Sequence, residues 1–122
     1  MKTKDDKINE WPQSWQGDKN DIPYGQEIIK YMIPFIEEMK KKGLSIKTIN
    51  KHIDNLWMLG GKIIEELNYY KENRKIPALK MILNNIDSNE GPLIHDFSEL
   101  QQGEFDSTCR KFYKFLKNWK QV

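Results

Sequence analysis

The chain has 122 residues and a formal net charge of +2, with 38% hydrophobic and 31% charged residues. This length suits one compact domain, and so small a net charge does not by itself indicate a nucleic-acid partner. No apolar run approaches the roughly 20 residues of a membrane-spanning helix, and the N-terminus lacks the apolar stretch of a secretory signal. One cysteine and two histidines predict neither an internal disulfide nor a structural zinc site. We therefore expect a cytoplasmic protein without cofactors.

Residues 1–23 are polar and interrupted by proline and glycine, which predicts an irregular N-terminal arm. Trp11 and Trp15 stand out in this segment, because free indole rings reduce solubility. We expect these rings to attach the arm to a helical domain formed by residues 24–122. The alternative is that the two rings are exposed and bind a partner.

The first helix is predicted at residues 24–42, where apolar residues recur at steps of three and four. Pro34 removes one backbone donor and is expected to kink or split this helix. Lys40, Lys41 and Lys42 complement the negative end of the helix dipole, and Gly43 is suited to a left-handed cap. These roles explain the three lysines without a binding function.

The second helix is predicted to begin after Ser45, a good N-cap residue. A heptad-like apolar seam follows at positions 46, 49, 53, 56, 60, 63 and 67. At about 100° per residue, Lys47, Lys51 and Lys62 lie on the opposite side. Gly60 in the seam allows a neighbouring helix to come close, although a break at the glycine pair 60–61 is equally compatible with the pattern.

Two further helices are predicted towards the C-terminus. A short one is expected from Pro77 to Asp87, followed by a loop at 88–97 and an optional single turn at 98–102. The last helix is expected to begin near Asp106 or Ser107. Its apolar stripe predicts a side that faces the core, and Cys109 on this stripe is expected to be a small buried hydrophobic residue. The stripe comprises Phe105, Cys109, Phe112, Leu116 and Trp119.

No catalytic motif is found, so we do not expect an enzyme. The segment from Gly60 to Lys62 lacks the hydroxyl residue and the earlier glycine of a phosphate-binding loop. Adjacent glutamates at 37–38 and 65–66 point about 100° apart on a helix and do not share a site. His52 is expected to be a partly covered side chain, and His95 has no metal-ligand partner at helical spacing.

Two stretches resemble a known family. GLSIKTINKHIDNLWMLGGKII (43–64) and FDSTCRKFYKFL (105–116) are similar to the second and fourth helices of the SAM-like, N-terminal core-binding domain of tyrosine recombinases, the phage integrase family. The resemblance implies an all-α orthogonal bundle of four to five helices that contacts DNA. The His-x-x-Arg pair of the family's catalytic domain is absent, since Asn55 and Ser98 stand three residues after the two histidines.

Two functions stay open at this point. The first is a non-catalytic module that binds double-stranded DNA through basic faces of the second and last helices. Lysine and arginine side chains that neutralise phosphates release the counterions of the DNA, and this release favours binding. Its candidate residues, with Asn55 as a further base-edge donor, are Lys47, Asn50, Lys51, Lys62, Arg110, Lys111, Lys114 and Lys117. The second is a protein-interaction or regulatory helical domain from a mobile element, with a protein partner or self-association through Met58, the tyrosines 69–70 and the arm tryptophans. Neither function involves a membrane.

Overall fold

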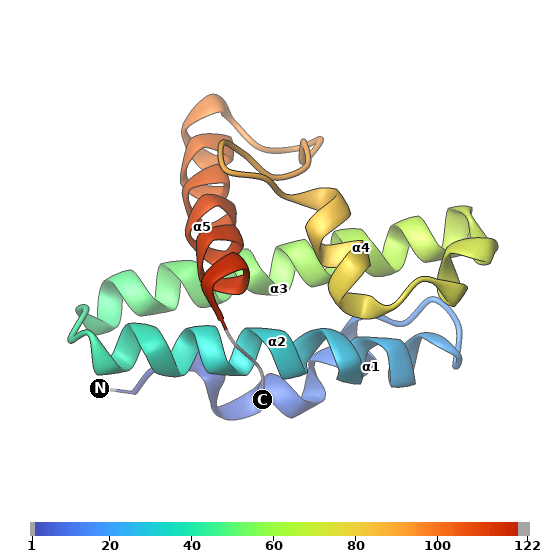
Figure 1. Cartoon of the computed structure of the whole chain (residues 1–122), viewed down its shortest axis with the longest axis horizontal. Coiled ribbons are helices and arrows are strands. Elements are labelled where there is room, and N and C mark those ends of the chain that lie inside the picture. Colours follow the sequence, from blue (N-terminus) through green and yellow to red (C-terminus); the bar gives the residue numbers. More distant parts are fainter. Residues whose placement is uncertain (1, 120–122) are drawn as a thin grey trace.

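The structure is a computed structural model, and it describes residues 2–119. All regular secondary structure in this range is helical (Figure 1). The elements in chain order are the 3-10 helix η1 (Lys4–Glu10), α1 (Trp11–Trp15), α2 (Asp21–Lys41), α3 (Ile46–Tyr69), the 3-10 helix η2 (Lys71–Lys75), α4 (Ala78–Asn85) and α5 (Glu99–Asn118). The predicted all-α bundle is confirmed.

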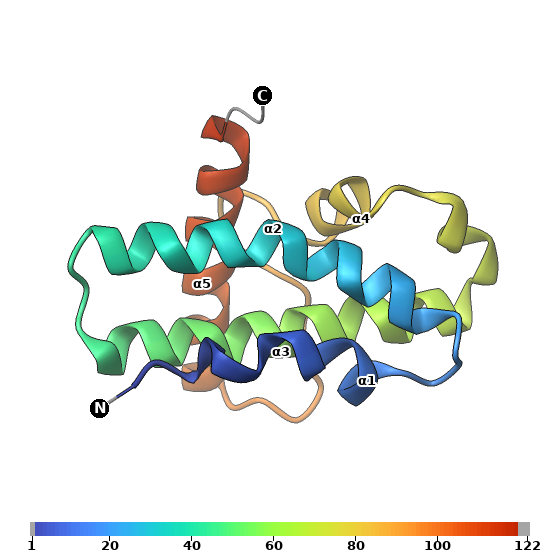
Figure 2. The same cartoon turned by 90° about the horizontal axis from the view of Figure 1, so that it is seen from below.

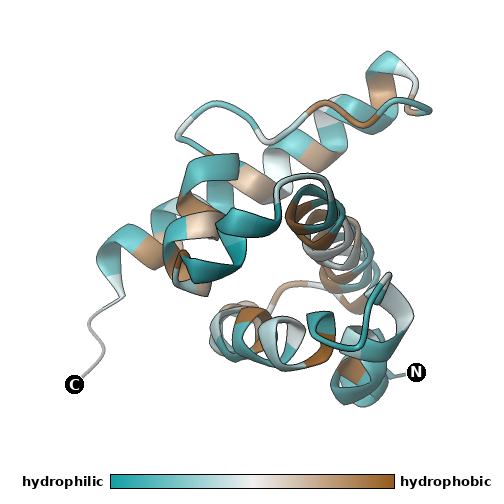
Figure 3. Cartoon of the chain, turned by 90° about the vertical axis from the view of Figure 1, so that its right-hand side faces the viewer, coloured by the Kyte–Doolittle hydropathy of each residue, from teal (hydrophilic) through white to brown (hydrophobic). Residues whose placement is uncertain are grey.

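The helices form three layers, and the antiparallel pair α2 and α3 is the middle one. In Figure 1, α4 and α5 lie on one side of this pair, and α5 crosses it steeply. The view from below in Figure 2 shows η1 and α1 on the other side, along α3. Seen end-on in Figure 3, hydrophobic and hydrophilic positions alternate along the helices, as expected for amphipathic elements that each bury one face.

The turn between α2 and α3 follows the predicted capping residues. Gly43 adopts a φ of 75°, and the backbone N–H of Leu44 donates to the carbonyl oxygen of Met39 at 3.3 Å. Oγ of Ser45 accepts a hydrogen bond from the backbone N–H of Thr48 at 3.1 Å, which starts α3. Of the two outcomes predicted at Pro34, a kink or a split, the split does not occur, since α2 continues through this residue as one helix.

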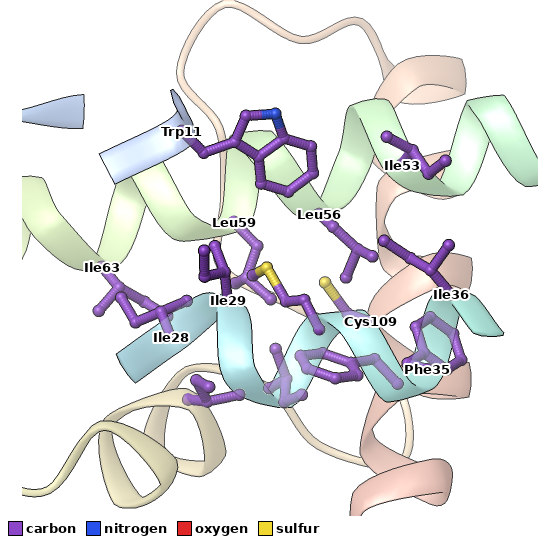
Figure 4. Packing of buried hydrophobic residues seen from close by; sticks show 14 of the residues in the cluster. Trp11, Ile28, Ile29, Phe35, Ile36, Ile53, Leu56, Leu59, Ile63 and Cys109 are labelled. Atoms are coloured by element: carbon purple, nitrogen blue, oxygen red, sulfur yellow. The ribbon is translucent and has the colours of Figure 1, made fainter. Parts of the chain in front are cut away.

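The core lies between α2, α3 and α5. All predicted seam positions of α3 from Ile49 to Leu67 are buried, while Ile46 is half-buried. Figure 4 shows Leu56 and Leu59 of α3 facing Ile29 and Ile36 of α2, with Cys109 of α5 beside them. The stripe predicted on α5 is buried as far as Leu116, and Trp119 is half-buried. Both predicted core faces are therefore confirmed.

The N-terminal arm is more ordered than predicted. It forms η1 and α1 instead of an irregular chain, and α2 begins at Asp21, before the predicted first residue. Trp11 and Trp15 are buried, and the indole N–H of Trp15 donates to the carbonyl oxygen of Trp57 at 3.0 Å. The prediction that both rings attach the arm is confirmed, and the alternative of exposed rings is wrong. Burial of these rings provides the apolar contact that orders the arm.

Gly60 accommodates the ring of Trp15. A Cβ atom at position 60 would lie 2.3 Å from Cζ2 and 2.4 Å from Cη2 of this ring. The glycine in the seam therefore allows the close approach of the short helix α1 through the ring of its last residue. The break considered at the glycine pair does not occur, because α3 is continuous from Ile46 to Tyr69.

Substituting Gly60 with alanine is expected to lower the free energy of unfolding by about 1–3 kcal/mol, because overpacking against a rigid ring outweighs the helix-propensity gain of about 1 kcal/mol. Gly103→Ala is the matched control, since an added Cβ there meets no atom within 4 Å. This control is expected to stabilise α5 by up to about 1 kcal/mol. Urea unfolding followed by circular dichroism measures both changes. Equal effects of the two substitutions would show that Trp15 does not rest on Gly60.

The last two helices differ from the prediction at their ends. α4 is shorter than expected, and it buries Ala78, Met81 and Ile82 while Leu79 and Leu83 are only half-buried. α5 begins at Glu99, because Ser98 and Gln101 form a reciprocal capping box. The optional turn at 98–102 is therefore the first turn of α5. The cap and the packing of the helix outweigh the cost of about 1 kcal/mol of an internal glycine at position 103.

Candidate functional site

The N-terminal half of α3 meets the middle of α5 through a small polar cluster. Nδ1 of His52 lies 2.7 Å from Oγ1 of Thr108, and Nδ2 of Asn55 donates to the same oxygen at 2.9 Å. His52 is only 6% exposed and thus more deeply buried than predicted. Burial, helped by the charge of Lys111, lowers the pKa of His52 to about 4. The ring is therefore neutral at pH 7 and adds no charge to this region.

Lysines from three elements gather around this helix crossing. Nζ of Lys51 lies 3.9 Å from Oε1 of Glu104 on α5, and Lys47 precedes it by one turn. Lys111 and Lys114 of α5 line one groove together with Lys42 from the end of α2. We call this set of five exposed residues the basic end, and it comprises Lys42, Lys47, Lys51, Lys111 and Lys114.

Three predicted cations are engaged in other contacts. Lys62 pairs with Glu65 at 3.3 Å and follows Lys51 by three turns, about 16 Å along the helix axis. The guanidinium of Arg110 donates to the carbonyl oxygen of Asn89 at 3.1 Å and so holds the 88–97 loop. The ammonium of Lys117 lies 6.0 Å from the ring centre of Tyr113. The predicted rows therefore contribute only part of their residues to the basic end.

Both predicted base-edge residues make contacts within the fold. Oδ1 of Asn50 accepts a hydrogen bond from the backbone N–H of Lys4 at 2.8 Å, which fixes the start of the arm. The amide of Asn55 joins α3 to α5, as described above. These contacts explain both asparagines without a role in DNA recognition.

The residues predicted as anchors for a protein partner are mostly covered. Met58 is half-buried against the core, and both arm tryptophans are buried. Only Tyr69 and Tyr70 are well exposed, at 77% and 57%. Of the predicted anchors, the two tyrosines therefore remain accessible to a protein partner, and the tryptophans do not.

An apolar groove opens beside the basic end. It has a volume of about 490 Å³ and lies where the end of α2, the turn to α3 and the C-terminal half of α5 meet. Its apolar lining is Phe35, Met39, Leu44, Phe115 and Trp119. This site was not predicted from the sequence, because helix capping already explained Lys42 and because Leu44 lies outside every periodic pattern. The signal available in the sequence was a leucine directly after the predicted Gly43 cap.

No known protein family, curated protein or solved structure matches this chain. The resemblance to the core-binding domain of tyrosine recombinases therefore stays a prediction. Within residues 2–119, no helix has the length and apolar character needed to cross a membrane.

Proposed function

We propose that this chain is a non-catalytic helical module that binds double-stranded DNA through the basic end. The observation that carries the proposal is the position of Lys51 and Lys111, which lie on α3 and α5 and flank the same helix crossing. A duplex presents closely spaced phosphates, so cations that share one surface can neutralise several of them at once.

The charges around the basic end support this proposal. The ion pair of Lys51 with Glu104 is long, and both side chains are about half exposed, so the pair is weak and can open. The other four lysines have no ion-pair partner among residues 2–119. These cations are therefore available to phosphates. Cys109, the single cysteine, is buried and unpaired, which suits the reducing cytoplasm that we propose as the location.

The proposal is tested by a triple charge reversal, Lys51→Glu, Lys111→Glu and Lys114→Glu. Because these side chains are exposed, the variant should stay folded while its affinity for DNA falls by roughly tenfold or more. Fluorescence anisotropy with a labelled 20-base-pair duplex of random sequence at low salt measures the affinity. The matched control reverses the exposed residues Lys71, Lys75 and Lys80, which lie on η2 and α4 away from the basic end.

The control changes the net charge of the protein by the same amount and should retain binding far better than the triple variant. Equal weakening of the two proteins, or no binding by the wild type at low salt, would contradict the proposed site.

A further inference from the structure

The apolar groove beside the basic end has a feature that DNA binding does not explain. Its floor is aliphatic and aromatic, whereas the backbone of a duplex presents charged phosphates. Leu44 is 39% exposed in the groove although it is a large apolar side chain. The volume of about 490 Å³ lies within the range of roughly 300–1,000 Å³ that is typical of ligand pockets. Such exposed apolar surface commonly marks a binding site.

The floor is held by rings that pack on one another. Phe115 stacks on Trp119 with ring centres 5.7 Å apart, and it also contacts Phe35 of α2 at 5.5 Å. Phe35 in turn packs on the buried ring of Phe112 at 5.2 Å. The groove is therefore built on helices and connected to the core, so that little ordering cost opposes binding.

The rim of the groove is positively charged. Lys42, Lys111 and Lys114 have no ion-pair partner in the described residues, and Glu38 is the one acidic side chain among the lining residues. The C-terminal ends of α2 and α5 add about half a negative charge each. An excess of positive charge is left, and it favours an occupant that carries carboxylates beside an apolar side chain.

We propose that this groove docks a short acidic, amphipathic segment of a protein partner. Leucine or phenylalanine side chains of the segment fill the floor between Met39, Leu44 and Phe115, and aspartate or glutamate side chains next to them pair with the three rim lysines. This site overlaps the proposed DNA contact at the rim lysines and differs from it in its apolar floor.

Peptide binding is measured with a fluorophore attached in the groove. Asn118 lines the groove and is exposed, so Asn118→Cys can carry an environment-sensitive fluorophore. The native Cys109 is 1% exposed, and burial raises the pKa of its thiol to about 12, so the label attaches at position 118. The probe is a synthetic peptide with Leu and Phe four residues apart and Asp and Glu at the flanking positions. We expect a saturable fluorescence change with this peptide.

Two comparison peptides separate the apolar from the charged contribution. Replacing Leu and Phe of the peptide with serine should weaken binding about tenfold or more, since the floor is then left without apolar contacts. Replacing its acidic residues with lysine should also weaken binding, and this effect should diminish at high salt. The proposal is overturned if the labelled protein shows no saturable change with the acidic peptide, or if the serine peptide binds equally well.

Two variants of the protein locate the contact. Leu44→Ser should weaken peptide binding about tenfold without unfolding, because Leu44 is partly exposed in a turn. Leu100→Ser is the matched control at a 74% exposed leucine on the first turn of α5, and it should have no effect. Unchanged peptide binding by Leu44→Ser would overturn the site. Because Leu44 carries no charge, Leu44→Ser should leave duplex binding unchanged, so the two proposals can fail independently.

Discussion

Replacing Asp21 with alanine is expected to lower the free energy of unfolding by about 3–5 kcal/mol. The substitution removes one partner of a buried ion pair and leaves the other charge uncompensated. The Asp21 side chain is fully buried, and its carboxylate lies 3.0 Å from Nη2 of Arg74. It also accepts hydrogen bonds from the backbone N–H groups of Gly17 and Asp18 and from Nδ2 of Asn68. One carboxylate thus joins the arm, α2, α3 and η2, and its loss leaves a partly buried guanidinium without a counter-charge.

The pH dependence of stability provides a second test of Asp21. Burial raises the pKa of this carboxyl, but the hydrogen bonds from Asn68, Gly17 and Asp18 and the charge of Arg74 outweigh burial and lower it below 3.8. The carboxylate therefore stabilises the fold fully above pH 3.8, and this contribution is lost as the pH falls through the lower pKa of the folded state. Urea unfolding of wild type and Asp21→Ala should consequently differ at pH 7 and converge in strong acid.

Asp54→Ala is the matched control for this prediction. Asp54 pairs with Lys4 at 3.1 Å, but both side chains are more than half exposed. Such a surface pair contributes about 0–1 kcal/mol. If Asp21→Ala costs no more than Asp54→Ala, the buried network does not hold the four elements together.

Replacing Phe112 with alanine is expected to lower the free energy of unfolding by about 3–5 kcal/mol. The ring is fully buried and packs on Phe35 of α2 at 5.2 Å between ring centres, so its removal leaves a cavity between α2 and α5. Tyr113→Ala on the same helix turn is the control, because Tyr113 is only half-buried. Thermal and urea unfolding measure both variants. A loss for Phe112→Ala no larger than that for Tyr113→Ala would mean that α5 is not anchored by this ring.

The sequence predicted those parts of the fold that depend on nearby residues. The caps at Gly43 and Ser45 and the apolar seam of α3 are local signals, and the structure confirms them. The helices of the arm could not be predicted in this way, because α1 is barely more than one turn and owes its order to Trp15 resting on Gly60. The start of the last helix was predicted near Asp106 or Ser107, although the cap at Ser98 starts the helix earlier.

The candidate site also combines features that local sequence predicts with features that depend on contacts between distant residues. Side-chain direction on a helix follows from spacing, so the outward positions of Lys51 and Lys114 could be predicted. Which cations share a surface depends on how α3 and α5 cross and on partners distant in sequence, such as Asn89 for Arg110. The groove depends on three separate elements, and no single segment contains its pattern.

Salt dependence of duplex binding tests the basic end most directly. If its five lysines each neutralise one phosphate, the logarithm of the binding constant should fall with the logarithm of salt concentration with a slope of about −4.5. Neutralising Lys111 and Lys114 with glutamine should reduce the magnitude of this slope by about 1.8. A slope near zero, or a slope unchanged in the glutamine variant, would contradict DNA binding by the basic end.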